Sequence, residues 1–260
     1  MLVVGGSDSS GGAGLARDIE TVSSVGLRSC LAVTAVTVQT HDAVSDILHL
    51  QPGLVADQMR AALQANKVAA IKIGMLATAP IAVAVAAVLR ENPSIPAVLD
   101  PVMASTSGRA LLAADAVALM KRDLMPLCRL VTPNLLELAL LVGAEPATDE
   151  DGLLRQGREL LAATGVQALL IKGGHAKGDR STDILLVPDR EPVRFDTPRL
   201  AVSMRGTGCM LASAIAAHLA KARSLEDSVR DGKQLVFQTL LKTGVTHSSP
   251  GDAGPRRSAM

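Results

Sequence analysis

Short apolar segments alternate with longer segments rich in Ala and Leu along almost the whole chain, and this alternation restricts the fold more than any other feature. The segments AAIKIG and AVLD are apolar on both faces, which is typical of strands buried within a parallel sheet. Strands that alternate with helices are joined by right-handed crossovers. The pattern therefore predicts the α/β class with a mostly parallel, doubly wound sheet.

The spacing of apolar residues, and the Gly and Pro residues between them, predict the range of each element. We expect strands at Leu2–Val4, Ser29–Val38, Ala69–Ile73, Ala97–Leu99, Leu130–Thr132, Ala168–Ile171, Asp183–Val187 and Pro192–Phe195. We expect helices at Gly14–Ser24, Leu54–Ala65, Pro80–Glu91, Ala114–Asp123, Leu135–Val142, Asp149–Thr164, Gly208–Lys221 and Leu225–Leu241. The last two strands, joined across Pro188, predict a hairpin at one edge of the sheet.

No repeat, charge block or low-complexity linker divides the chain. We therefore expect one domain over residues 1–246. Residues 247–260 are rich in Ser, Pro, Gly and Arg and have no apolar face. This composition predicts a disordered C-terminal tail.

Charge and aromatic content argue against a nucleic-acid partner. The 26 Lys and Arg residues nearly balance the 25 Asp and Glu residues, so the net charge of +1 provides no strongly basic face for phosphates. With two Phe and no Tyr or Trp, the chain also lacks platforms on which bases could stack.

Three features predict a cytoplasmic protein without a membrane partner. No uncharged apolar run approaches the length of about 18 residues that a membrane helix requires. The first residues lack the basic and apolar regions of a secretory signal. Cys30, Cys128 and Cys209 are odd in number and widely spaced, which predicts free thiols rather than a disulfide framework or a zinc site.

Two glycine-rich segments directly precede expected helices. Residues 5–14, GGSDSSGGAG, match neither GxxxxGKS nor GxGxxG, and they predict either the floor of a small-ligand pocket or a flexible turn. Residues 205–210, RGTGCM, open a long Ala-rich helix, where glycines let successive N–H groups face one anion. Cys209 lies in the first turn, where the helix dipole lowers the pKa of a thiol; an ordinary buried cysteine is the alternative.

Polar residues also follow three apolar strands. Asp100 comes after AVL, Asn134 and Glu137 come after LVTP, and Lys172 comes after ALLI. In an open α/β sheet, ligands bind beyond the carboxyl ends of the strands. Each residue alone fits a helix cap or a solvated side chain. Together, two carboxylates, an amide and a cation beside an anion cradle suit Mg²⁺-assisted phosphoryl transfer.

A further group of residues predicts a pocket for a small polar ring. Gln39 ends the second strand and presents a donor and an acceptor together, as the edge of an aminopyrimidine requires; a surface glutamine is the alternative. Asp18 lies one helical turn after the first glycine-rich segment. Met75 and Val102 offer apolar walls in a chain with almost no aromatic residues.

Seven of these segments resemble the hydroxymethylpyrimidine/phosphomethylpyrimidine kinases of thiamine biosynthesis, within the ribokinase-like superfamily. They are GGSDSSGGAGLARDIET, TAVTVQT, KIGML, LDPVMAS…SGRALL, VTPNLLEL, IKGGH and GTGCMLASAIAAHLA. They span about residues 2–222 and keep the family's order and spacing, which makes the joint match specific.

The resemblance implies a three-layer α/β/α ribokinase-like fold and a homodimer. It implies ATP as co-substrate and Mg²⁺ as cofactor. It also implies two successive reactions, in which the hydroxymethyl group of 4-amino-5-hydroxymethyl-2-methylpyrimidine is phosphorylated and the monophosphate is then phosphorylated again.

The resemblance further implies a role for each motif residue. The pyrimidine contacts are expected from Gly6, Asp18, Gln39, Met75 and Val102, the ATP contacts from Lys172, Gly174 and Asn134, the magnesium contacts from Asp100 and Glu137, and the catalytic anion hole from Gly206, Thr207, Gly208 and Cys209. Cys209 stands where related sugar kinases carry an aspartate base.

Three segments depart from the family's motifs, one of which, ARDIET in place of the common QADLKT, keeps its aspartate as Asp18. Arg205 replaces the histidine of NTHGTGC, and Thr106 replaces the lysine of AKSG. The alternatives are a pyridoxal/pyridoxine kinase, which can also carry GTGC, and a non-catalytic pyrimidine-binding module. Gln39 and Met75 favour the aminopyrimidine, and the phosphoryl-transfer residues favour catalysis. Glycine-containing segments at Ser105–Leu111 and Gly174–Thr182 are candidate lids.

Overall fold

The computed structural model describes residues 1–104, 114–174 and 178–246, and over these residues the chain forms one sheet of nine strands in the order β3-β2-β1-β4-β5-β6-β7-β8-β9. The strands are β1 (Leu2–Asp8), β2 (Cys30–Gln39), β3 (Val44–His49), β4 (Ile71–Ile73), β5 (Ala97–Leu99), β6 (Leu130–Val131), β7 (Leu169–Ile171), β8 (Arg180–Leu186) and β9 (Val193–Pro198). The six neighbouring strands β2, β1, β4, β5, β6 and β7 pair in parallel. Pairing is antiparallel at both edges, between β2 and β3 and from β7 through β8 to β9.

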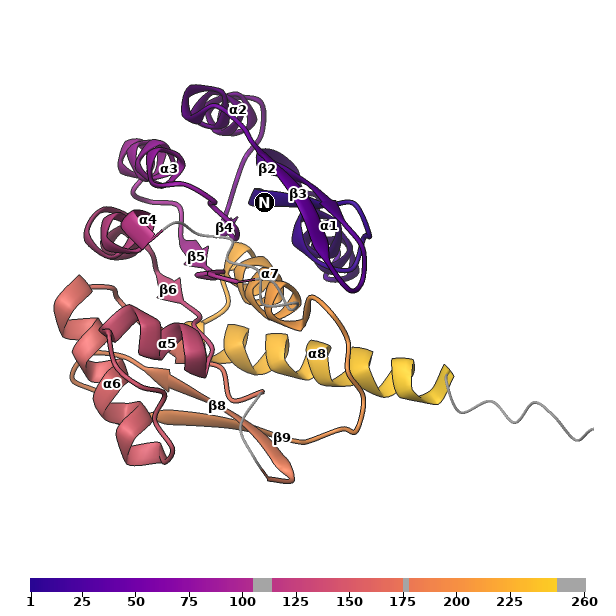
Figure 1. Ribbon diagram of the computed structural model, residues 1–260, viewed down its shortest axis with the longest axis vertical. Coiled ribbons are helices and arrows are strands. Elements are labelled where there is room, and N and C mark those ends of the chain that lie inside the picture. The colour runs from indigo at the N-terminus through magenta and orange to yellow at the C-terminus, as the bar shows by residue number, and fades with distance from the viewer. Residues whose placement is uncertain (105–113, 175–177, 247–260) are drawn as a thin grey trace, which may run out of the picture.

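Helices connect the strands and cover both faces of the sheet (Figure 1). They are α1 (Gly14–Ser24), α2 (Pro52–Ala65), α3 (Ala79–Glu91), α4 (Ala114–Leu119), α5 (Leu135–Val142), α6 (Glu150–Thr164), α7 (Thr207–Ala220) and α8 (Leu225–Thr246), with a π-helical turn η1 (Met120–Leu124) and a 3-10 turn η2 (Met125–Leu127) after α4. Helices α2 and α3 each begin with a proline in the first turn, where the missing N–H would have no partner within the helix.

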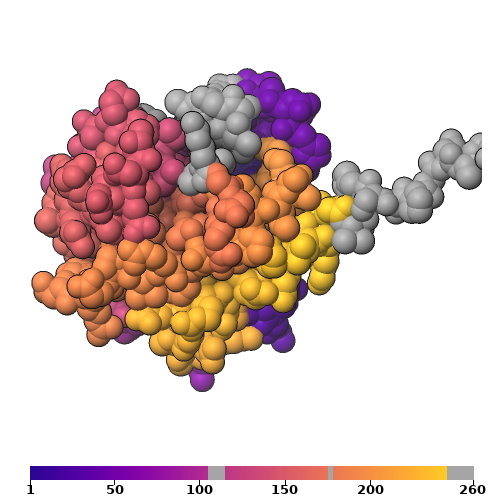
Figure 2. Space-filling model, turned by 90° about the horizontal axis from the view of Figure 1, so that it is seen from below, coloured from indigo at the N-terminus to yellow at the C-terminus, as the bar shows by residue number. Residues whose placement is uncertain are grey.

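Two main apolar cores separate the three layers. Helices α1, α7 and α8 lie on one face of the sheet, and α2 to α6 lie on the other (Figure 1). In β5, Leu99 belongs to the core beneath α2 to α6, while its neighbour Val98 packs with Ile215 of α7 and Val229 of α8. Successive residues of a strand point to opposite faces, so a central strand must be apolar throughout. Figure 2 shows α8, in yellow, beside the orange surface of β8 and β9.

The structure confirms the predicted α/β fold, the mostly parallel sheet and the hairpin at its edge. The prediction missed β3, whose residues are mostly exposed and form no continuous apolar run. It also ended β1 too early. The glycines that were assigned to a loop continue the strand to Asp8, because Gly6, Ser7 and Asp8 pair with β2.

Some predictions fall outside the described residues. The candidate lid Ser105–Leu111, the position Thr106 and the tail 247–260 lie outside them entirely, and the candidate lid Gly174–Thr182 does so in part. The division into a domain of residues 1–246 and a tail stays a prediction. Among the described helices, none is long and apolar enough to cross a membrane. Cys30, Cys128 and Cys209 are free thiols.

Candidate active site

A pocket of about 450 Å³ opens along the carboxyl ends of the parallel strands. Its wall includes every residue that the sequence singled out for a site: Gly6, Asp18, Gln39, Met75, Asp100, Val102, Asn134, Glu137, Lys172, Gly174, Gly206, Thr207, Gly208 and Cys209. The parallel topology explains this gathering, because the segments that leave β1, β4, β5, β6 and β7 all start from the same edge of the sheet.

The N-terminal end of α7 forms one wall of the pocket. Gly206 precedes the helix with a φ of 75°, in the left-handed region, and a Cβ there would lie 2.5 Å from the carbonyl oxygen of Gly12. Only glycine satisfies both conditions without strain. No side chain caps the free N–H groups of the first turn, so they are available to an anion from the pocket.

Cys209 lies in this first turn, is half-buried and lines the pocket. Burial raises the pKa of the thiol to about 11, and the carboxylates of Asp18 and Asp100 act in the same direction. The ammonium of Lys72 and a hydrogen bond from the Gly14 N–H act in the opposite direction but are outweighed. The expectation of a lowered pKa is therefore wrong, because desolvation exceeds the effect of the helix dipole.

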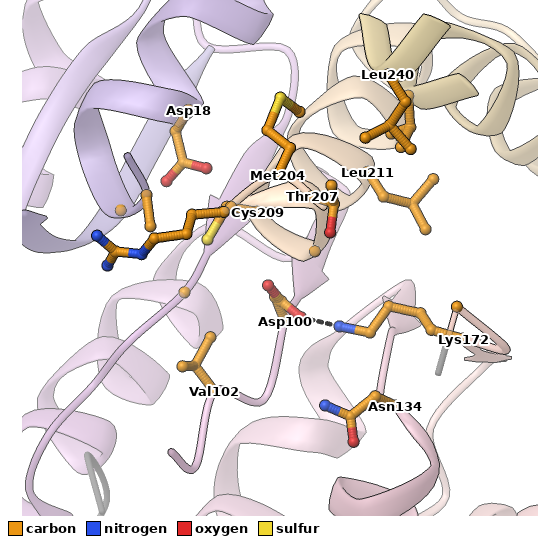
Figure 3. A pocket seen from close by; sticks show the side chains of 18 of the residues that line it. Asp18, Asp100, Val102, Asn134, Lys172, Met204, Thr207, Cys209, Leu211 and Leu240 are labelled. Carbon is orange, nitrogen blue, oxygen red and sulfur yellow. Dashed lines mark hydrogen bonds and ion pairs between the residues drawn. The ribbon is translucent and has the colours of Figure 1, made fainter. Parts of the chain in front are cut away.

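Lys172 joins the two carboxylates that the sequence assigned to magnesium. Its Nζ lies 2.6 Å from Asp100 Oδ1 and 3.7 Å from Glu137 Oε2. Figure 3 shows the side chains of Asp100 and Lys172 pointing toward one another below Thr207 and Cys209, at the start of α7. Burial alone would lower the pKa of Lys172, but Asp100 and Glu137 outweigh it and hold that pKa above its usual range. Lys172 is therefore a fixed cation on the pocket wall.

Asn134 and Glu137 form a capping box at the start of α5. Asn134 Oδ1 accepts a hydrogen bond from the Glu137 N–H at 2.9 Å, and Glu137 Oε2 accepts one from the Asn134 N–H at 2.8 Å. Each side chain thereby satisfies a backbone donor that the helix leaves free. Burial raises the pKa of Glu137, and the charge of Lys172 opposes that rise. The box fixes both side chains at the edge of the pocket.

Replacing Asn134 with alanine should lower the free energy of unfolding by about 1 kcal/mol, the usual cost of losing an N-terminal cap. Asp149 is a matched control, because it caps α6 through the Gly152 N–H and is not part of the pocket wall. We expect Asp149→Ala to have a similar cost in urea unfolding. Only Asn134→Ala should also weaken ligand binding, because only Asn134 lines the pocket. Equal ligand affinity in both variants would restrict Asn134 to a structural role.

A buried ion pair lies close to Cys209. Lys72 Nζ lies 2.8 Å from both carboxylate oxygens of Asp18, and Ser213 Oγ donates to Asp18 Oδ1 at 2.8 Å. Both charged side chains are 1% exposed. Burial raises the pKa of Asp18, against the lowering effect of Lys72. Lys72 and Ser213 thus bind the carboxylate of Asp18, which also lines the pocket, and its expected contact with a ring stays a prediction. A lysine within the apolar strand IKI was the signal for this pair.

Gln39 at the end of β2, Gly6 in β1 and Met75 just after β4 line the pocket on the side of the sheet away from β7 and Lys172. Gln39 Oε1 accepts a hydrogen bond from Thr37 Oγ1 at 3.2 Å. A Cβ at Gly6 would lie 2.9 Å from the sulfur of Met75, so the glycine is what allows Met75 to pack here. This end therefore combines an amide with an apolar, polarisable side chain.

The chain is similar in sequence to a family of known proteins. The profile of the phosphomethylpyrimidine kinase family matches residues 8–251. The hydroxymethylpyrimidine/phosphomethylpyrimidine kinase of Rhizobium meliloti (strain 1021) is 42% identical over 233 residues, which cover 89% of this chain and 86% of that protein. The chain belongs to the phosphomethylpyrimidine kinase family.

Solved structures of similar fold include members of this family and of a neighbouring group. The phosphomethylpyrimidine kinase of Clostridium difficile 630 superimposes with a TM-score of 0.79 at 30% identity, covering 92% of this chain and 97% of that chain. The pyridoxal kinase of Staphylococcus aureus in complex with pyridoxal gives a TM-score of 0.83 at 28% identity, covering 92% of this chain and 86% of that one. The fold is thus that of the ribokinase-like kinases, as the resemblance implied.

The structure also adds residues to this family site that the sequence analysis did not select. An apolar part of the wall comes from Leu200, Val202, Met204, Leu211, Val236, Phe237 and Leu240, around the start of α7 and along α8. A second buried pair joins Lys233 Nζ to Asp183 Oδ2 at 2.8 Å, and Asp183 Oδ1 accepts the Gly173 N–H at 2.9 Å. The apolar wall and the Lys233–Asp183 pair both depend on long-range packing of α8 and β8, so no local sequence motif predicts them.

The carboxylates of the site fit a magnesium ion that is bound partly by the protein and partly by substrate phosphates. Mg²⁺ prefers oxygen ligands, keeps several waters and is commonly held by one or two carboxylates together with substrate phosphates. Asp100 and Glu137 supply two carboxylates on the two sides of Lys172. Among the described residues, no group of three or more His, Cys, Asp or Glu side chains forms a complete metal cage. The protein's share of such a site would be these two carboxylates, which in this structure pair with Lys172.

Proposed function

We propose that this chain is an ATP-dependent kinase that phosphorylates 4-amino-5-hydroxymethyl-2-methylpyrimidine and then its monophosphate, in thiamine biosynthesis. The observation that carries the proposal is the arrangement within one pocket of a fixed cation, Lys172, between two carboxylates and facing the uncapped N-terminus of α7. Phosphoryl transfer depends on such positioning and charge stabilisation more than on covalent chemistry. The names of the family and of the R. meliloti relative support the same activity.

We assign the pyrimidine ring to the end of the pocket lined by Gly6, Gln39 and Met75, with Val102 as a further wall. The Gln39 amide pairs with the donor and acceptor edge of the aminopyrimidine. The hydroxymethyl group then faces Cys209, which accepts its proton during the first transfer. Asp18 acts indirectly, because it binds Lys72, which lies close enough to Cys209 to affect the pKa of the thiol.

We assign the phosphates of ATP to Lys172, Gly174 and Asn134, and the transferred group to the backbone N–H groups of residues 206–209. These donors are fixed before the reaction, so they stabilise developing charge without reorganising. Asp100 and Glu137 would hold Mg²⁺ and its waters, and the ion would neutralise charge on the phosphates. The apolar wall formed by α7 and α8 suits the base of the nucleotide.

A pyridoxal kinase remains the second candidate because pyridoxal kinases share the fold. The acceptor distinguishes the two activities. ADP release should be measured with ATP and Mg²⁺ while the aminopyrimidine alcohol, its monophosphate and pyridoxal are offered in parallel. We expect turnover of both pyrimidines. Turnover of pyridoxal alone would reject the proposed substrate, and tight pyrimidine binding without turnover would indicate a binding module.

The proposal includes a homodimer in the cytoplasm. Val36 and Val38 of β2 and Leu48 of β3 are exposed at the sheet edge, and Val36 pairs directly with Leu48. A second copy of the chain would cover this apolar face. Sedimentation should give twice the monomer mass of 26.8 kDa, and Leu48→Glu should give the monomer. The free thiols are consistent with a reducing compartment.

A further inference from the structure

The side chain of Arg205 turns inward just before α7, and it is 17% exposed. Its Nη1 donates to Ser10 Oγ and to the carbonyl oxygen of Thr40, each at 2.9 Å. Its Nη2 lies 3.4 Å from Asp8 Oδ2. One guanidinium thus joins two segments that lie far from it and from each other in the sequence. These are the glycine-rich segment after β1 and the turn between β2 and β3.

The segment after β1 and the turn between β2 and β3 both fix the position of Gln39. Ser9, next to Ser10, donates through Oγ to the Gln39 carbonyl at 2.8 Å and accepts the Gln39 N–H at the same distance. Thr40, which Arg205 binds, directly follows Gln39. The backbone of Gln39 is therefore fixed by Ser9 from one side and, through its neighbour, by Arg205 from the other.

The charge of Arg205 is already matched within the protein. The Asp8 side chain is 4% exposed, and its Oδ1 accepts hydrogen bonds from the Ser10 N–H at 2.9 Å and from Ser10 Oγ at 2.7 Å. Arg205 supplies the positive charge beside this buried carboxylate. The two terminal nitrogens of the guanidinium thus bridge fixed acceptors as a rigid fork, while the buried Nε has no hydrogen-bond partner among the described residues and the side chain also lines the pocket.

We infer that Arg205 is a positioning residue for substrate recognition, which ties the β2–β3 turn to the segment after β1 and so holds Gln39 against the pyrimidine. This inference rests on the proposed function, because it assigns the ring to Gln39. Its consequence is specific. The pyrimidine alcohol and its monophosphate carry the same ring, so Arg205 must contribute equally to both.

The test compares Arg205→Lys with the unchanged enzyme. Lysine keeps the positive charge near Asp8 but loses the fork that reaches two segments at once. We expect KM for the alcohol and KM for the monophosphate to rise by the same factor, about tenfold, since small misplacements of a recognition group have effects of at least this size. KM for ATP and kcat should change less than twofold. Calorimetry with the alcohol alone should show the same loss of affinity.

A double substitution separates positioning from general damage. If Arg205 acts through Gln39, Arg205→Lys should add little to the loss caused by Gln39→Ala, because coupled residues are not additive. Arg190→Lys, at an exposed position in the turn between β8 and β9, is the control and should change nothing.

Three results would overturn the inference. A rise in KM for the monophosphate alone would make Arg205 a phosphate ligand. If the losses caused by Arg205→Lys and Gln39→Ala add fully, Arg205 does not act through Gln39. If Arg205→Lys leaves KM for both pyrimidines unchanged, Arg205 has no role in recognition. Failure of the proposed function would look different, because the unchanged enzyme itself would then not turn over either pyrimidine.

Discussion

Replacing Lys172 with methionine should lower kcat about 10³-fold, which is the upper end of the loss caused by removing one fixed charge-stabilising donor. Lys172 Nζ is a cation on the wall of the pocket, held by Asp100 and Glu137. Methionine has a similar length and no charge. Without the ammonium, the phosphates of ATP would approach the carboxylates of Asp100 and Glu137 without the cation that pairs with both. Steady-state ADP release with the pyrimidine alcohol measures the effect.

Lys67→Met is the matched control, because Lys67 is exposed and is not part of the pocket wall. It should leave kcat unchanged. Circular dichroism of both variants should show the same helix content, so that the loss can be assigned to the site. A Lys172→Met enzyme that keeps a tenth or more of its kcat would refute the role assigned to this lysine.

Replacing Cys209 with alanine should reduce the first phosphorylation about 10²-fold and the second by much less, because a positioned base contributes at least this factor when a weakly acidic alcohol must lose its proton. In the second reaction the acceptor is already a phosphate anion and needs little help from a base. Single-turnover measurements with the alcohol and with the monophosphate separate the two steps. Equal losses in both steps would instead indicate that Cys209 positions the substrates.

The pH dependence of the first step follows from the raised pKa of Cys209. With a pKa of about 11, only about one thiol in 10⁴ is ionised at pH 7. The thiolate is the form that accepts a proton, and its fraction grows as pH rises toward the pKa. The value of kcat/KM for the alcohol should therefore increase about tenfold per pH unit between pH 7 and 9.

The same profile tests the assignment. Cys209→Ala should abolish the rise with pH for the alcohol, and the profile of the monophosphate should lack it in both enzymes. If the unchanged enzyme and Cys209→Ala give parallel profiles for the alcohol, the thiol does not act as the base. The buried pair of Lys72 and Asp18 provides a further check, because loss of Lys72 removes a charge that lowers the thiol pKa.

Local sequence patterns were enough to predict the central sheet and most of the candidate site. A central parallel strand is buried on both faces, so its residues are apolar in succession, as in AVL before Asp100. The first polar residues after such strands necessarily lie at the ligand-binding edge. Asp100, Asn134, Lys172 and the glycines of residues 206–208 could therefore be placed together before the structure was known.

Contacts between distant segments required the tertiary structure. The ion pair of Lys72 with Asp18 joins residues 54 positions apart, and Arg205 reaches Ser10 across 195 positions. Neither contact leaves a periodic signal, because each depends on how whole helices and strands pack. The edge strand β3 was missed for a related reason: its pairing with β2, and not its own composition, makes it a strand.

The pKa of Cys209 most clearly separates what local sequence predicts from what contacts between distant segments decide. The sequence by itself determined that this thiol lies in the first turn of a helix after a glycine-rich segment, and from there a lowered pKa was expected. Only the tertiary structure decided the direction, because burial within the fold and the carboxylates of Asp18 and Asp100 raise the pKa of the thiol. A helix dipole is a local property that sequence reveals, whereas desolvation depends on everything that packs around the group.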